Sequence, residues 1–138
     1  MKNLSEYLLE QENDIKAFTI IKPGFLKYKD EINEYIKEKG FIMKDESNPM
    51  KLTDFQAKEL YKPHKDKDFY NDLCKYMISD DCYAATWQYD HSDNPIDAMD
   101  KIKDHFRNKY GKDEMKNCMH SSDSLNNVKR ESKIIFNN

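Results

Sequence analysis

The sequence N-C-M-H-S-S-D-S occupies residues 117–124 and leads directly into an amphipathic segment. We predict a short strand over 117–120. Serine and aspartate oxygens accept hydrogen bonds from free backbone N–H groups, so the residues that follow favour the start of a helix. Residues 124–136 predict that helix because apolar side chains fall broadly on one side of it: Leu125, Val128, Ile134 and Ile135. His120 therefore stands at the end of a strand that turns into the last helix.

A carboxylate follows His120 at a distance of eleven positions, at Glu131. If the helix returns past the strand, this carboxylate can reach the imidazole. A carboxylate on one ring nitrogen fixes the tautomer, leaves the lone pair of the other nitrogen free to attack, and stabilises the cation that attack creates. The same residues also suit a polar strand end with a helix N-cap and no chemistry. The spacing alone leaves both interpretations open.

The rest of the chain predicts alternating strands and helices. Apolar and β-branched runs predict three further strands: 17–22, the first part of 41–52, and 82–89. Periodicity and capping residues predict five further helices: 3–12, 25–39 before Gly40, 54–61 after Thr53, 66–78, and one that Asn94 and Pro95 open and that runs through Phe106. This order is compatible with an α+β, ferredoxin-like sandwich having a four-stranded antiparallel sheet.

Length and composition fit one domain, residues 1–138, with residues 1–15 as an N-terminal helical extension. Charged residues make up 36% of the chain but the net charge is only -3, which makes nucleic acid an unlikely partner. The three cysteines form no C-x-x-C pair, so we expect no disulfide framework and a reducing, cytoplasmic location. We find no signal peptide and no apolar run of about 18 residues that would span a membrane.

Metal and phosphate motifs built by the protein itself are missing from the sequence. The four histidines have no H-x-x-x-H or H-x-H spacing, so we expect no protein-built transition-metal site. The chain also has neither a Walker lysine motif nor a G-x-G-x-x-G motif. If a nucleotide binds, side chains must hold it.

The pattern N-x-x-H-x-S-D-S closely resembles the active-site signature of the nucleoside diphosphate kinases, which usually reads N-x-x-H-G-S-D-S. Other intervals match that family over roughly residues 17–136: T-I-I-K-P at 19–23, Tyr61 with Phe69 eight positions later, Arg107 thirteen positions before His120, and Glu131 eleven after it. The resemblance implies the ferredoxin-like fold and a homo-oligomer with a dimer as the minimum. It also implies nucleoside di- and triphosphates as partners, with no membrane involved.

The resemblance further implies a Mg²⁺-dependent ping-pong transfer of a γ-phosphoryl group through phosphohistidine at His120. Glu131 and Ser122 then organise the histidine. The other implied roles are charge neutralisation by Lys22 and Tyr61, phosphate pairing by Arg107, base stacking by Phe69 and ribose binding by Asn117. Mg²⁺ is expected to be held mainly through the nucleotide phosphates.

The chain departs from the family pattern at several places. Gly24 replaces an aspartate, Ser121 replaces a glycine, and the segment before His120 is shortened. A phosphate-contacting arginine and threonine of the family cannot be placed, and Lys101 and Lys103 are possible substitutes for the lost charge. The alternative is therefore a catalytically weak or inactive nucleotide-binding or interaction module of the same fold. A ferredoxin-like RNA binder is disfavoured, since no RNP-type aromatic motif is visible.

Overall fold

The computed structural model describes residues 3–4, 14–111 and 113–136. Most of the predicted helix 3–12, and with it most of the 1–15 extension, lies outside these residues. The described chain forms an antiparallel sheet of order β2-β3-β1-β4, built from β1 (Ala17–Ile21), β2 (Phe41–Glu46), β3 (Tyr83–Tyr89) and β4 (Met119–Ser121). The predicted α+β, ferredoxin-like fold class is confirmed.

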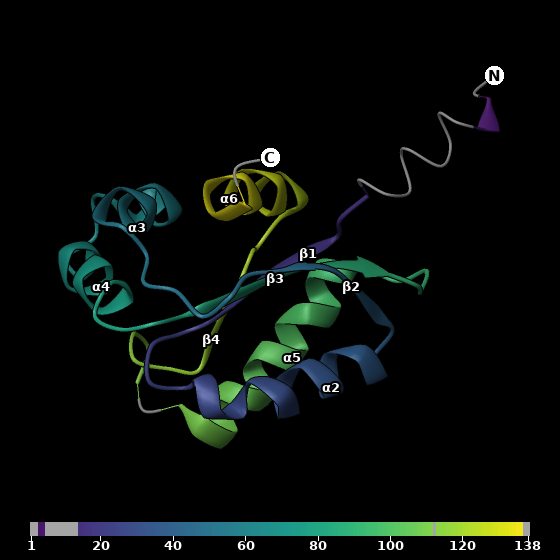
Figure 1. Ribbon diagram of the computed structural model, residues 1–138, viewed down its shortest axis with the longest axis horizontal. Coiled ribbons are helices and arrows are strands. Elements are labelled where there is room, and N and C mark those ends of the chain that lie inside the picture. Colours follow the sequence, from purple (N-terminus) through teal and green to yellow (C-terminus); the bar gives the residue numbers. More distant parts are fainter. Residues whose placement is uncertain (1–2, 5–13, 112, 137–138) are drawn as a thin grey trace.

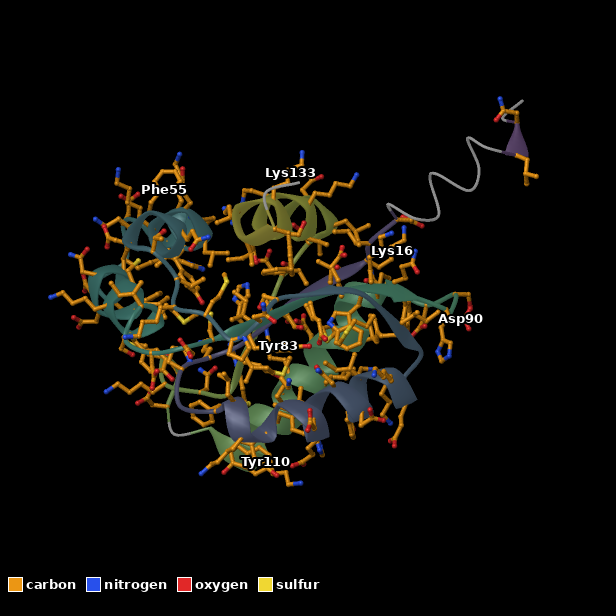
Figure 2. All side chains as sticks on the ribbon, in the orientation of Figure 1. Lys16, Phe55, Tyr83, Asp90, Tyr110 and Lys133 are labelled. Atoms are coloured by element: carbon orange, nitrogen blue, oxygen red, sulfur yellow. The ribbon has the colours of Figure 1, made fainter. Side chains whose placement is uncertain are left out.

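Helices cover both faces of this sheet (Figure 1). One face carries α2 (Lys29–Glu38) and α5 (Pro95–Tyr110), while the other carries α3 (Asp54–Leu60), α4 (Tyr70–Met77) and α6 (Leu125–Phe136). Two 3₁₀ turns complete the chain: η1 (Leu26–Tyr28) and η2 (Lys62–His64). Figure 2 shows Tyr83 inside the α2/α5 layer, and the side chains of Phe55 and Lys133 on the outer side of α3 and α6.

Strand β1 is buried on both faces because each layer packs against it. Successive side chains of a strand point to opposite faces. Accordingly Ala17 and Ile21 belong to the core under α2 and α5, whereas Phe18 and Ile20 belong to the core under α3, α4 and α6. This double burial explains why the strand reads as a continuous apolar run.

Helix boundaries follow local capping rules where the sequence offers them. The Thr53 hydroxyl accepts from Gln56 N, and the Gln56 side chain accepts from Thr53 N, so the predicted N-cap of α3 is confirmed as a capping box. The Asn94 side chain likewise caps α5 ahead of Pro95. The left-handed φ of +101° at Gly40, which favours glycine, terminates the segment after α2.

Two predicted helices begin later than expected. The segment 25–39 starts as the 3₁₀ turn η1 and becomes α-helical only at Lys29. The predicted helix 66–78 was wrong in its first turn, because hydrogen bonds from Lys67 N to His64 O and from Tyr70 N to Lys67 O form successive tight turns instead. The α-helix α4 therefore starts at Tyr70.

The edge strand β4 fixes the position of His120. β4 pairs with β1 so that His120 lies opposite Ile20, and Lys22 N donates to Cys118 O over 3.0 Å just beyond the paired residues. Lys22 and His120 therefore reach the same end of the sheet, although they are far apart in the sequence.

The capping box of α3 gives a direct stability test. Replacing Thr53 with alanine leaves Gln56 N without its side-chain acceptor, so we expect a loss of about 0.5–2 kcal/mol in the free energy of unfolding, measured by urea denaturation. Thr53→Ser keeps the hydroxyl and should stay near the wild-type value. Equal losses in both variants would contradict the assignment.

Candidate active site

A pocket of about 1080 Å³ opens where the end of β1, β4 and helices α3 to α6 converge. Six of the eight residues that the sequence singled out line it: Lys22, Tyr61, Phe69, Arg107, His120 and Glu131. The other two, Ser122 and Asn117, lie buried behind its wall. The fold thus brings most of the predicted residues to one place.

The imidazole of His120 is held by a buried carboxylate. His120 Nε2 lies 2.5 Å from Glu131 Oε1, and Ser122 Oγ donates to the same oxygen over 2.8 Å. Glu131 is only 3% exposed, and the rings of Phe18 and Tyr61 stand edge-on to the imidazole. Because a carboxylate accepts hydrogen bonds, Nε2 carries the proton in the neutral ring and Nδ1 keeps a free lone pair.

Helix α6 brings Glu131 back to His120. The Ser124 hydroxyl accepts from Asn127 N over 3.1 Å and stabilises the first turn immediately after β4. Val128, Glu131 and Ser132 form the buried face of the helix, since positions three and four apart lie on one side. The eleven-residue interval therefore runs from the strand end, through the helix cap, to the second turn of α6 on its buried face.

Arg130 is a contact residue that sequence reasoning missed. Its Nη1 donates to Glu59 O over 2.7 Å, its Nη2 to Leu60 O over 3.2 Å, and Nη2 also lies 3.3 Å from Glu131 Oε2. This guanidinium ties the end of α3 to the carboxylate that holds His120. An arginine beside a glutamate on a helix gives no signal of this role, since adjacent helical residues point in different directions.

Three cationic side chains converge on the pocket beside His120. Lys22 is only 3% exposed, and its Nζ donates to Met115 O over 3.2 Å. Burial first, and then the nearby Arg107 and Lys103, lower the pKa of Lys22 to about 7. Arg107 donates through Nε and Nη2 to Met119 O, over 3.1 and 2.9 Å. Of the two lysines considered as substitutes on α5, Lys103 lines the pocket and Lys101 does not.

Two aromatic side chains occupy different depths of the pocket. Tyr61 is buried, and within the described residues its hydroxyl has no hydrogen-bond partner. Desolvation raises the Tyr61 pKa well above its usual value, so the hydroxyl stays protonated and can donate. Phe69 is 44% exposed at the mouth, with the His64 ring 5.8 Å away. The Tyr61 hydroxyl is therefore an available donor deep in the pocket, and the Phe69 ring is a flat apolar surface near solvent.

Asn117 holds the chain that precedes β4. Its Nδ2 donates to Asp113 O over 3.2 Å and to Glu114 O over 2.7 Å, and the side chain is buried. Its Oδ1 has no partner within the described residues. The amide is thus committed to the backbone of the pocket wall, and the ribose contact expected of it stays a prediction.

The chain matches the family model described as nucleoside diphosphate kinase over residues 15–138. The nucleoside diphosphate kinase of Persephonella marina is 29% identical over 133 residues, covering 88% of this chain and 92% of that protein. The nucleoside diphosphate kinase of Fervidobacterium nodosum is 30% identical over 130 residues, covering 88% of each.

Solved structures show the same fold. The Aquifex aeolicus nucleoside diphosphate kinase superposes with a TM-score of 0.76 at 24% identity, covering 87% of this chain and 93% of that one. The Halobacterium salinarum enzyme, solved in complex with CDP, gives 0.72 at 23% identity, covering 88% and 87%. In the part of the chain that the structure describes, no helix is both long and apolar enough to cross a bilayer.

The buried lysine should make stability depend on pH. Lys22 has a pKa of about 7 in the folded protein and 10.5 in the unfolded chain, so between these values the unfolded chain binds the extra proton and stability rises with pH. The cost of burying the charge is therefore complete below pH 7 and fades toward pH 10.5. We expect Lys22→Met to stabilise the protein by about 1–3 kcal/mol more at pH 6 than at pH 9.

Urea denaturation at the two pH values measures this difference. Lys101→Met is the matched control, because Lys101 is exposed on α5 and should show no such pH dependence. A Lys22→Met effect that is the same at both pH values would mean that Lys22 keeps an ordinary pKa.

Removing the Arg130 guanidinium should destabilise the folded protein. Arg130→Ala leaves the carbonyls of Glu59 and Leu60 without their donors, and we expect a loss of about 1–3 kcal/mol in the free energy of unfolding. Lys129→Ala, one residue away on α6, serves as the control. Thermal or urea unfolding measures both, and equal small effects would show that the Arg130 contacts contribute nothing to stability.

Proposed function

Since this chain belongs to the nucleoside diphosphate kinase family, we propose that it transfers the γ-phosphoryl group of a nucleoside triphosphate to a nucleoside diphosphate. The observation that supports this most is the pairing of His120 Nε2 with the buried Glu131, which leaves Nδ1 free beside three cations. A scaffold with no chemistry has no need of a nucleophile whose tautomer is fixed.

The transfer occurs in two half-reactions. Nδ1 of His120 attacks the γ-phosphorus, a N–P bond forms, and the bond from phosphorus to the β,γ-bridging oxygen breaks, which releases a nucleoside diphosphate. Glu131 stabilises the positive charge that develops on the ring, while Ser122 holds that carboxylate in place. A second nucleoside diphosphate then attacks the phosphohistidine through its terminal oxygen, and the N–P bond breaks.

Charge on the moving phosphoryl group is neutralised by fixed donors. Lys22 and Arg107 supply positive charge, and the Tyr61 hydroxyl, which has no partner within the described residues, supplies a hydrogen bond. Donors that are already oriented in a partly buried site need little reorganisation during the reaction. A bound phosphate would also favour the protonated form of Lys22, whose pKa of about 7 lies close to neutral.

The mouth of the pocket suits the nucleoside. Phe69 presents an exposed ring on which any base can stack, since every base has a π-face. Asn117 is expected to contact the ribose, and its Oδ1, which has no partner within the described residues, can accept a hydrogen bond from a ribose hydroxyl.

Mg²⁺ belongs to the proposal as a companion of the substrate. Within the described residues no group of three or more His, Cys, Asp or Glu side chains is placed to hold a metal ion. An ion that is carried mainly by the nucleotide phosphates needs no such group of protein ligands, and it would offset part of the phosphate charge. We further propose a homodimer as the minimum assembly and a cytoplasmic location.

A second candidate function is a nucleotide-binding module with weak or no turnover. The observation in its favour is that the side chains of Arg107 and Asn117 already hydrogen-bond to the backbone. Arg107 donates from Nε and Nη2 to Met119 O, and Asn117 donates from Nδ2 to Asp113 O in the pocket wall. These particular donors reach a ligand only if the contacts with the backbone are shared or released. The two candidates differ in whether His120 becomes covalently modified.

Phosphoenzyme formation separates the two candidates. Protein mixed with γ-labelled ATP and Mg²⁺ should give an acid-labile, alkali-stable label that added GDP or UDP removes. His120→Ala should abolish the label, whereas His105→Ala, on the outer side of α5 against Tyr35, should keep it. Nucleotide binding by calorimetry without labelling would sink the kinase and leave the binding module.

A further inference from the structure

Helix α5 directs two cations into the pocket from one face. Lys103 and Arg107 both line the pocket, and residues four apart on a helix are surface neighbours about 5–6 Å apart at Cβ. Like charges at this spacing repel each other and destabilise an isolated helix. Lys22 approaches from the end of β1, close enough that Lys103 and Arg107 both lower its pKa. Three cations thus share one wall.

The protein leaves most of this charge without an anionic partner. Among the described residues, Lys22 and Arg107 form no ion pair and donate instead to the carbonyls of Met115 and Met119. Lys103 has one ion pair, from Nζ to Asp100 Oδ1 at 3.3 Å, one turn back on its own helix. Excess positive charge in a partly buried wall stabilises a bound anion and costs stability without one.

Within the described residues, Lys103 differs from Lys22 and Arg107 because its ammonium contacts a carboxylate and not a backbone carbonyl. Its side chain is 18% exposed, and its Nζ lies 3.3 Å from Asp100 Oδ1, an oxygen that is buried and has no hydrogen-bond partner within the described residues. A lysine ammonium is a point charge on a flexible stem, so Lys103 can turn from Asp100 toward an anion in the pocket. Lys22 and Arg107, by contrast, are fixed by burial and by backbone carbonyls.

We propose that Lys103 is a phosphate-binding residue that contacts the terminal phosphates of the bound nucleotide together with Lys22 and Arg107. The proposal rests on the nucleotide site of the proposed function and adds a contact for which the sequence offered Lys101 and Lys103 equally. It assigns the role to Lys103 alone, because Lys101 is exposed and lies outside the pocket. The ligand class is a nucleoside di- or triphosphate, recognised through its distal charge.

Calorimetric titration with ADP, AMP and adenosine tests the contact without requiring turnover. Lys103→Gln keeps most of the stem and removes the charge, so we expect ADP affinity to fall about tenfold and adenosine affinity to stay the same. AMP, which lacks the distal phosphate, should lose less than ADP. Lys101→Gln should bind all three ligands like the wild type.

Asp100→Asn distinguishes a phosphate contact from a purely structural pair. If Lys103 serves the ligand, freeing it from Asp100 should leave ADP affinity unchanged or raise it. If Lys103 only supports α5, Asp100→Asn and Lys103→Gln should both lower stability by similar amounts and change the affinity for ADP and adenosine alike. That result, or an unchanged ADP affinity in Lys103→Gln, overturns the proposal.

The test of Lys103 and the test of the proposed kinase activity can fail independently. Loss of ADP affinity in Lys103→Gln, together with a wild-type protein that takes no label from γ-labelled ATP, supports Lys103 and refutes the kinase. Labelling in the wild type, together with full ADP affinity in Lys103→Gln, does the reverse. A wild-type protein that binds no ADP overturns both.

Discussion

The hydrogen bond between His120 Nε2 and Glu131 Oε1 is the contact on which the other features of the site depend. It requires β4 to pair at the sheet edge with β1, α6 to begin within four residues of that strand, and Glu131 in the second turn of α6 to face inward. Ser122 and Arg130 then hold the two oxygens of the carboxylate from opposite sides. The fold therefore sets the tautomer of one histidine through a chain of local constraints.

Burial has opposite consequences for the charged groups around this contact. Glu131 is buried but receives hydrogen bonds on both oxygens, so its charge is compensated. Lys22 is equally buried but forms no ion pair within the described residues, and its burial, together with the nearby Arg107, lowers its pKa to about 7. A site that holds uncompensated cations beside a free imidazole nitrogen is organised for an anion that arrives from solution. Burying the charge of Lys22 therefore costs stability where the lysine is protonated.

Local rules made much of this fold predictable from the sequence. Thr53 and Asn94 cap their helices through side-chain oxygens, and the apolar run of β1 predicts a strand that is buried on both faces. Sequence also located the pocket-lining residues, because matched intervals around His120 identified the family. Contacts that join distant segments could not be predicted in this way, and the reach of Arg130 across to the carbonyls at the end of α3 is the clearest example. Lys103 lies between these cases, since the sequence offered it together with Lys101 as a possible substitute for the lost charge, and only the structure places Lys103 rather than Lys101 in the pocket wall.

Nitrogen NMR of the imidazole of His120 tests the central contact most directly. With ¹⁵N-labelled histidine, the shifts and the couplings to ring protons report which nitrogen carries the proton in the neutral ring. The geometry predicts a proton on Nε2, directed at Glu131, and a bare Nδ1, and it predicts that Glu131→Ala loses this preference. A neutral His120 with its proton on Nδ1 in the wild-type protein would contradict the account, because the nitrogen assigned to the attack would then have no lone pair available.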